Sequence, residues 1–200
     1  MRQGAVMAND KRGPWTVASK QEIYDNEWIR VSHYAVETPR GGQGIYGSVH
    51  YKHFAIGIVP VDTEGYTFLV GQFRFPINRY TWEIPEGGGP LGIDPLESAA
   101  RELAEETGLM ARGWHQLLCC DLSNSVSDER AIAFLAWDLT QGQASPEPTE
   151  ELEIRRLPLT EAFRMVASGA IDDALSVVSL QAVQLLYQDN RLPKGLPIVR

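Results

Sequence analysis

Three glutamates stand at a spacing that suits metal binding. Glu102, Glu105 and Glu106 occupy positions i, i+3 and i+4, so a helix would place their carboxylates on one face. Hard oxygen ligands gathered in this way suit Mg2+, Mn2+ or Ca2+ rather than copper or structural zinc. The spacing suits a cation site, but taken alone it favours a solvated acidic face that pairs with Arg101.

The segment before these glutamates is rich in glycine. Residues 82–92 read WEIPEGGGPLG, which indicates a strand that enters a loop. Glycine permits close approach of the backbone to a ligand, and a loop carbonyl can complete the shell of a hard cation. The segment therefore favours the cation site over the solvated face.

The helix that must position the glutamates carries signals at both ends. Asp94 suits the N-cap, Pro95 suits the first helical position, and Glu97 completes a capping box. Gly108 suits the left-handed position that ends a helix. We predict a helix over residues 95–107.

Hydrophobic periodicity predicts the remaining elements. Strands are expected over residues 28–35, 54–61, 66–73, 114–121 and 131–139, helices over 160–168 and 172–187, and a loop over 141–148. This order predicts a mixed α/β fold. We expect one domain over residues 15–200, with an N-terminal strand region over 15–52, after a poorly ordered lead-in over residues 1–14.

Composition bounds the partners. The 200 residues are 44% hydrophobic and carry a net charge of -8, from 18 basic and 26 acidic side chains, so no basic face for nucleic acid is expected. No apolar run approaches the roughly 20 residues that span a bilayer, and we expect no secretory leader. Neighbours on a strand point to opposite faces, so we expect no disulfide between the adjacent Cys119 and Cys120. We expect a cytoplasmic protein without membrane or nucleic-acid partners.

The segment from Gly87 to Leu109 resembles the Nudix box, G-x5-E-x7-R-E-U-x-E-E-x-G-U, where U is aliphatic. The matching residues are Gly87, Arg101, Glu102, Leu103, Glu105, Glu106, Gly108 and Leu109. One position departs: Ile93 replaces a glutamate that usually pairs with the box arginine, and Asp94 or Glu97 could pair with Arg101 instead. Upstream, QFRF at 72–75 and WEIP at 82–85 resemble the ADP-ribose and nucleotide-sugar pyrophosphatase branch. The resemblance implies a Nudix-type α/β/α sandwich with a mixed central sheet and an N-terminal antiparallel strand region.

The resemblance also implies the metal ligands. Glu102 and Glu106 would be the principal ligands of Mg2+, with Mn2+ as a substitute. Glu105 would assist them in binding and catalysis, and the carbonyl of Glu86 would complete the set.

Further roles follow for substrate contact and for the general base. Arg74 would contact the phosphates, with Arg79 as a second candidate. The alternative for either is a surface salt bridge, which is weighed more heavily for Arg79. Trp28 and Tyr51 could stack a base, but their types and positions favour packing aromatics on their strands. For the base that activates water the branch favours a later loop: Glu150, then Glu151, with Glu129 as an auxiliary. A solvated charge run is the alternative for these acids.

The function that the resemblance implies is Mg2+-dependent hydrolysis of the diphosphate of ADP-ribose or a related nucleoside diphosphate sugar. A homodimer that exchanges N-terminal strands is implied as well. Residues 122–127 lack the proline common in ADP-ribose-selective enzymes, which leaves GDP-mannose or another hexose nucleotide as an alternative. An alternative of another class is a non-catalytic Nudix-like sensor of a nucleotide metabolite, but such domains typically lose box carboxylates. Hydrolysis of capped RNA would require a basic surface.

Overall fold

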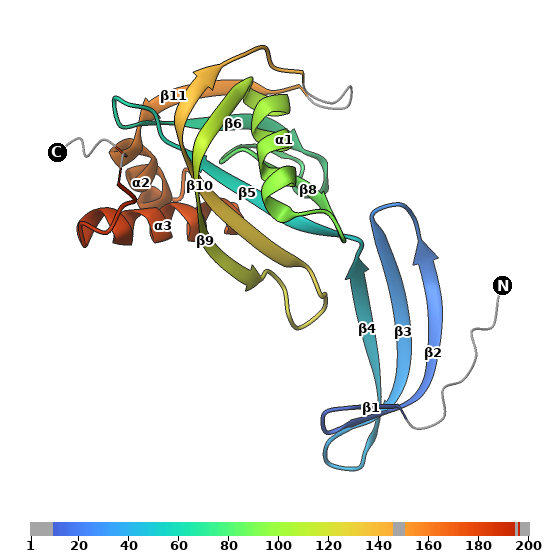
Figure 1. Ribbon diagram of the computed structural model, residues 1–200. Coiled ribbons are helices and arrows are strands. Elements are labelled where there is room, and N and C mark those ends of the chain that lie inside the picture. Colours follow the sequence, from blue (N-terminus) through green and yellow to red (C-terminus); the bar gives the residue numbers. More distant parts are fainter. Residues whose placement is uncertain (1–9, 146–150, 195, 197–200) are drawn as a thin grey trace. The chain divides into compact units, whose positions relative to one another are not determined.

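A computed structural model describes residues 10–145, 151–194 and 196 (Figure 1). The described chain divides into two compact units. The first comprises residues up to 53 together with 121–129, and the second comprises residues 54–120 and those from 130 onward. The predicted N-terminal strand region therefore forms most of a unit of its own. The prediction of one domain over 15–200 stays a prediction.

The first unit is an antiparallel sheet with the strand order β1-β2-β3-β4. Its strands are β1 (Asp10–Arg12), β2 (Trp15–Asp25), β3 (Ile29–Glu37) and β4 (Gln43–Tyr51). Val17, Tyr34 and Val36 form its small core. The lead-in was predicted to be poorly ordered up to residue 14. This is wrong for residues 10–12, because they form β1 and pair with β2. Residues 1–9 lie outside the described part.

The second unit contains a four-stranded sheet with the order β8-β5-β10-β9. Its strands are β5 (His53–Pro60), β8 (Glu86–Pro90), β9 (Leu109–Asp121) and β10 (Arg130–Gln141). β5 and β10 are parallel, with Ala55 opposite Ala131. Residues 86–90 thus form a strand where a glycine-rich loop was predicted. Glycine lets this strand pack closely on β5. A Cβ on Gly89 would lie only 2.8 Å from Cγ1 of Ile56.

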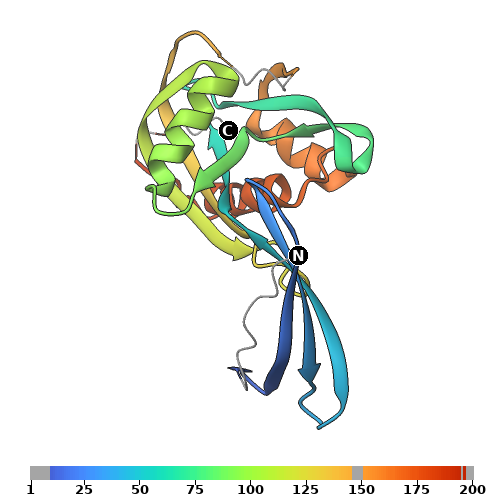
Figure 2. The ribbon, with the colours of Figure 1, turned by 90° about the vertical axis from the view of Figure 1, so that its right-hand side faces the viewer.

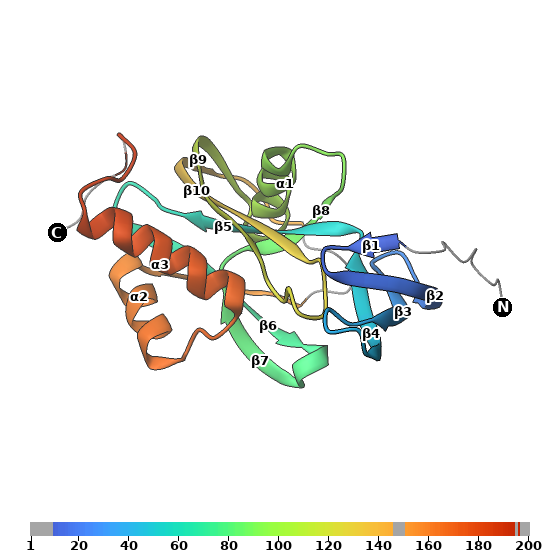
Figure 3. The same ribbon diagram turned by 90° about the horizontal axis from the view of Figure 1, so that it is seen from below.

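A three-stranded sheet, ordered β11-β6-β7, and three α-helices complete the second unit. These elements are β6 (Tyr66–Arg74), the short 3-10 helix η1 (Phe75–Ile77), β7 (Arg79–Glu83), α1 (Pro95–Thr107), β11 (Glu153–Pro158), α2 (Leu159–Ser168) and α3 (Ala174–Gln188). α1 lies on one side of β5 and β10, and α2 and α3 lie on the other (Figures 2 and 3). No helix in the described part of the chain is long and apolar enough to cross a membrane.

Helix α1 has the predicted bounds. The Asp94 side chain accepts a hydrogen bond from the Leu96 amide at 2.9 Å, and Gly108 ends the helix at φ 72°. Ala99 and Leu103 are fully buried against Ile56 and Ile58 of β5. This packing fixes which face of α1 turns toward β8, and so where the box glutamates lie.

Candidate active site

Two carboxylates of α1 converge on the start of β8. The Glu86 amide donates a hydrogen bond to Oε2 of Glu106 at 3.0 Å. The Glu102 carboxylate lies against Gly87 so closely that a Cβ there would be 2.2 Å from its Cδ. Glu102 and Glu106 are only 9% and 2% exposed. The alternative of a solvated acidic face is therefore wrong for these two residues, because β8 covers them.

The box arginine ties the helix to the same strand. Arg101 Nη2 donates to the Gly88 carbonyl at 2.9 Å and to Oε1 of Glu102 at 2.6 Å, and Nη1 donates to Oε2 of Glu105 at 2.5 Å. Asp94 and Glu97 were predicted as its possible partners, and this prediction is wrong. The Asp94 side chain caps α1, while the nearer box carboxylates and the Gly88 carbonyl satisfy Arg101.

The residues at this junction fit a hard divalent cation. Glu102 and Glu106 bring buried carboxylate oxygens to the backbone of residues 86 and 87, and carboxylate and carbonyl oxygens are the ligands that Mg2+ accepts. Gly87 leaves the space that the Glu102 carboxylate occupies, and a side chain at this position would collide with it.

Arg74 is held by the carboxylates of Glu83 and Glu86. Its Nε lies 3.1 and 3.0 Å from Oε1 and Oε2 of Glu83, and its Nη2 lies 2.7 Å from Oε1 of Glu86. Arg79 pairs with Asp172 at 2.7 Å, and both side chains are substantially exposed. The surface salt bridge that was the alternative for Arg79 is thus present. Both arginines line a cavity of about 340 Å3.

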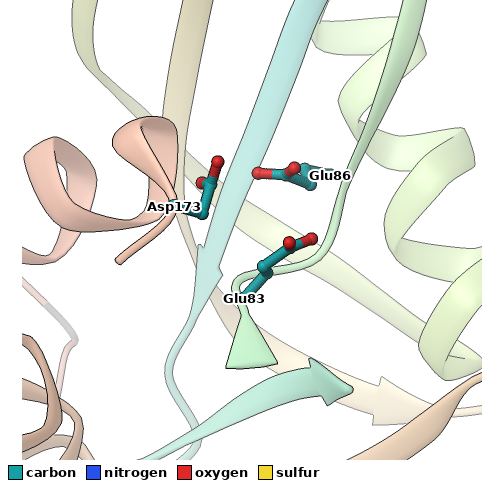
Figure 4. Close-up of side chains that lie close together, drawn as sticks. All are labelled: Glu83, Glu86 and Asp173. Carbon is teal, nitrogen blue, oxygen red and sulfur yellow. The ribbon is translucent and has the colours of Figure 1, made fainter. Parts of the chain in front are cut away.

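Glu83, Glu86 and Asp173 form an acidic cluster at this cavity (Figure 4). One carboxylate oxygen from each lies within 4.8 Å of the others. Oε2 of Glu86 is buried without a hydrogen-bond partner. Burial, followed by the charges of Asp173 and Glu83, raises the pKa of Glu86 well above its ordinary value. A proton on Glu86 relieves the repulsion within this cluster.

Sequence reasoning missed two members of this cluster. Glu83 stands in the WEIPE motif, and its proximity to Glu86 was the available signal. Asp173 comes from the turn before α3, where its side chain accepts a hydrogen bond from the Ser176 amide at 2.7 Å. Only the tertiary fold brings this residue to β8.

The predicted general-base residues fall in three places. Glu150 lies outside the described residues. Glu151 is exposed and stands two residues before β11 begins at Glu153. Glu129 belongs to the first unit, where burial raises the pKa of Tyr51 and a hydrogen bond to the Glu129 carboxylate raises it further.

The aromatic candidates for base stacking also belong to the first unit. Trp28 is 52% exposed, and its ring centroid lies 5.0 Å from that of His53. Tyr51 is partly buried at the end of β4, and its amide donates a hydrogen bond to Oδ1 of Asp128 at 2.8 Å. Both residues therefore have packing or hydrogen-bond partners within their own unit.

Comparison with known proteins agrees with this geometry. The model of the NUDIX domain family matches residues 51–177. The ADP-ribose pyrophosphatase of Bacillus subtilis is 31% identical over 169 residues, which cover 84% of this chain and 91% of the relative. The ADP-ribose pyrophosphatase of Mycobacterium tuberculosis is 33% identical over 159 residues, which cover 78% and 77%.

A solved structure shares the fold. The crystal structure of an ADP compounds hydrolase superposes with a TM-score of 0.80 at 20% identity, and the match covers 92% of this chain and all of that one. The mixed α/β fold of this chain, with its acidic helix packed on a glycine-rich strand, is therefore the Nudix fold. The chain belongs to the Nudix family, and its resemblance to the ADP-ribose pyrophosphatase branch is confirmed.

Proposed function

We propose that the chain hydrolyses the diphosphate bond of ADP-ribose or a related nucleoside diphosphate sugar in a Mg2+-dependent reaction. The products would be a nucleoside monophosphate and a sugar phosphate. The observation that carries the proposal is the convergence of the buried Glu102 and Glu106 carboxylates on the backbone at Glu86 and Gly87. The two ADP-ribose pyrophosphatases named above support the substrate class.

The metal would be held by Glu102, Glu106 and the carbonyl of Glu86, with Glu105 assisting. When bound there, a divalent cation supplies Lewis-acid neutralisation of the diphosphate charge. The chain's own contribution is to hold the carboxylates in place. Arg101 does so by linking Glu102 and Glu105 to the Gly88 carbonyl.

The remaining roles concern the proton and the substrate. Glu150 or Glu151 would accept the proton of the attacking water, with Glu129 as an auxiliary. Arg74 would contact a phosphate by exchanging one of its two carboxylate partners for a phosphate oxygen, because its planar guanidinium suits either anion. Arg79 is the second phosphate candidate. Trp28 and Tyr51 would stack the base.

Two alternatives differ in substrate or in class. A hexose nucleotide such as GDP-mannose is favoured by the absence of proline from residues 122–127. A non-catalytic sensor would bind the nucleotide without turnover, and the retention of all three box carboxylates argues against it.

The test is a substrate screen that follows release of the nucleoside monophosphate. ADP-ribose, GDP-mannose, ADP-glucose, UDP-glucose, NADH and diadenosine polyphosphates are each incubated with Mg2+ and with EDTA. We expect hydrolysis of a nucleoside diphosphate sugar that EDTA abolishes. Binding without turnover of any compound would contradict the enzyme and favour the sensor.

The matched variants lie on one helix. Glu106→Gln should lower kcat by orders of magnitude and leave the circular dichroism spectrum unchanged, because a carboxylate ligand is lost and the volume is kept. Glu97→Gln changes an exposed acid on α1 and should retain kcat. Full activity of Glu106→Gln would remove this carboxylate from its role.

A further inference from the structure

Tyr80 of β7 lies across the central strand of the three-stranded sheet. The register places Gly71 of β6 opposite both Trp82 of β7 and Glu153 of β11. A Cβ on Gly71 would lie 2.3 Å from the Tyr80 hydroxyl oxygen. The missing side chain at Gly71 thus lets the Tyr80 ring reach over β6, where its hydroxyl donates a hydrogen bond to Oε2 of Glu153 at 3.1 Å.

A second contact reinforces the first. The rings of Tyr80 and Trp82 meet edge to face, with centroids 5.8 Å apart and planes at 76°. The Arg155 guanidinium lies 5.7 Å above the Trp82 ring, a geometry that suits a cation-π contact. Two alternate residues of β11, Glu153 and Arg155, are therefore each held by an aromatic residue of β7.

These contacts hold β11 at its first residue, Glu153. After the end of β10 the Ser145 amide donates to the Glu105 carbonyl at 2.8 Å, and the Gly142 amide donates to the Gly108 carbonyl at 2.7 Å. Gly142 and Ser145 are thus bonded to the end of α1, and Glu153 is bonded to β7. Glu151 stands two residues from the Tyr80 anchor.

The Glu151 carboxylate lies within electrostatic reach of this anchor. Burial raises the pKa of Tyr80, the hydrogen bond to Glu153 raises it further, and the charge of Glu151 adds to the same direction. A general base must be held within a fraction of an ångström of its productive position. The hydrogen bond from Tyr80 to Glu153 restricts the positions open to Glu151.

We propose that Tyr80 is a positioning residue, whose hydroxyl holds Glu153 and so aligns Glu151, two residues before it, as the general base. The inference rests on the proposed function. It assigns Tyr80 no contact with substrate or metal. Because the hydroxyl is only one partly exposed hydrogen-bond donor, its loss should disturb alignment more than stability.

The test uses the full-length chain with Mg2+ and the substrate that the screen identifies. Tyr80→Phe removes one oxygen and keeps the ring against Gly71 and Trp82. We expect kcat to fall on the order of tenfold, below the roughly hundredfold cost of a 1 Å misplacement. KM should stay within about twofold of wild type, because no substrate contact is lost. The melting temperature should be unchanged.

Variants of Glu153 complete the cycle. Glu153→Ala should lower kcat as Tyr80→Phe does, whereas Glu153→Gln keeps an acceptor oxygen and should retain it. The double variant Tyr80→Phe/Glu153→Ala should be no slower than either single variant, because both remove one hydrogen bond. Tyr66→Phe is the matched control, since Tyr66 occupies the far end of β6 opposite Pro158.

The outcomes separate this inference from the proposed function. A wild-type protein that hydrolyses no nucleoside diphosphate sugar would sink both. An active wild type with an unchanged kcat in Tyr80→Phe would sink the positioning role alone. The same holds if KM or the melting temperature moves together with kcat, or if the two substitutions multiply in their effects.

Discussion

Glu86 joins the two charged clusters of the second unit. Its amide bonds to Glu106, its Oε1 accepts from Arg74, and its Oε2 is buried without a partner. A buried carboxylate without full hydrogen bonding costs free energy when it is ionised. The Glu86 side chain therefore serves to hold Arg74 and not to stabilise the fold.

The raised pKa of Glu86 predicts how stability depends on pH. Below the unfolded value of about 4.5 the carboxyl is protonated in both states. As pH rises from there through the higher folded value, unfolding releases a proton, so stability is lost. Glu86→Gln removes this titration. In EDTA-containing buffer the variant should melt at a higher temperature than wild type near neutral pH, and the difference should shrink toward about pH 4.

The control is Glu97→Gln, which neutralises an exposed acid on α1. Its melting curve should follow that of wild type at every pH. Parallel pH profiles for Glu86→Gln and wild type would show that the buried carboxyl does not titrate as its surroundings require.

Spacing alone was sufficient to find the acidic residues of α1, and insufficient to find the cluster beside them. Glu102, Glu105 and Glu106 share a helix face whatever the rest of the fold does. Asp173 reaches Glu86 only because the turn before α3 meets the start of β8 in the folded chain. No local pattern encodes that meeting.

The same division holds for the secondary structure elements. The bounds of α1 were predicted because Asp94 and Pro95 mark its first turn and Gly108 follows its last. β8 was missed because glycines disfavour a strand locally. Its conformation comes from pairing with β5, where a glycine at position 89 leaves room for Ile56. Local signals suffice for a capped helix and fail for a strand that tertiary pairing creates.

The contribution of the Asp94 cap to the stability of α1 can be measured with two variants. Asp94→Ala removes the acceptor for the Leu96 amide and should lower the free energy of unfolding by about 1 kcal/mol. Asp94→Asn keeps an acceptor oxygen and should lose little. Urea denaturation monitored by circular dichroism gives both values. Equal stability of the alanine and asparagine variants would show that the side chain contributes no cap.

At the scale of the whole molecule, the first unit exposes several large apolar side chains. Ile23, Tyr24 and Trp28 are each more than half exposed, and Ile45 is 73% exposed. Its core consists of three residues. Exposed apolar side chains gathered on a small unit are typical of interaction surfaces, which supports the proposal of a homodimer built through the N-terminal strands.

If the chain is a homodimer, a charged substitution in the dimer interface should halve the measured mass. Light scattering after size exclusion should give twice the mass of one chain for the wild type. Ile45→Glu should shift the mass toward that of one chain, because an unpaired charge is excluded from an interface core. Leu185→Glu is the matched control, since Leu185 is 62% exposed on α3 of the second unit, and it should leave the mass unchanged. A wild type with the mass of one chain at every concentration would refute the dimer.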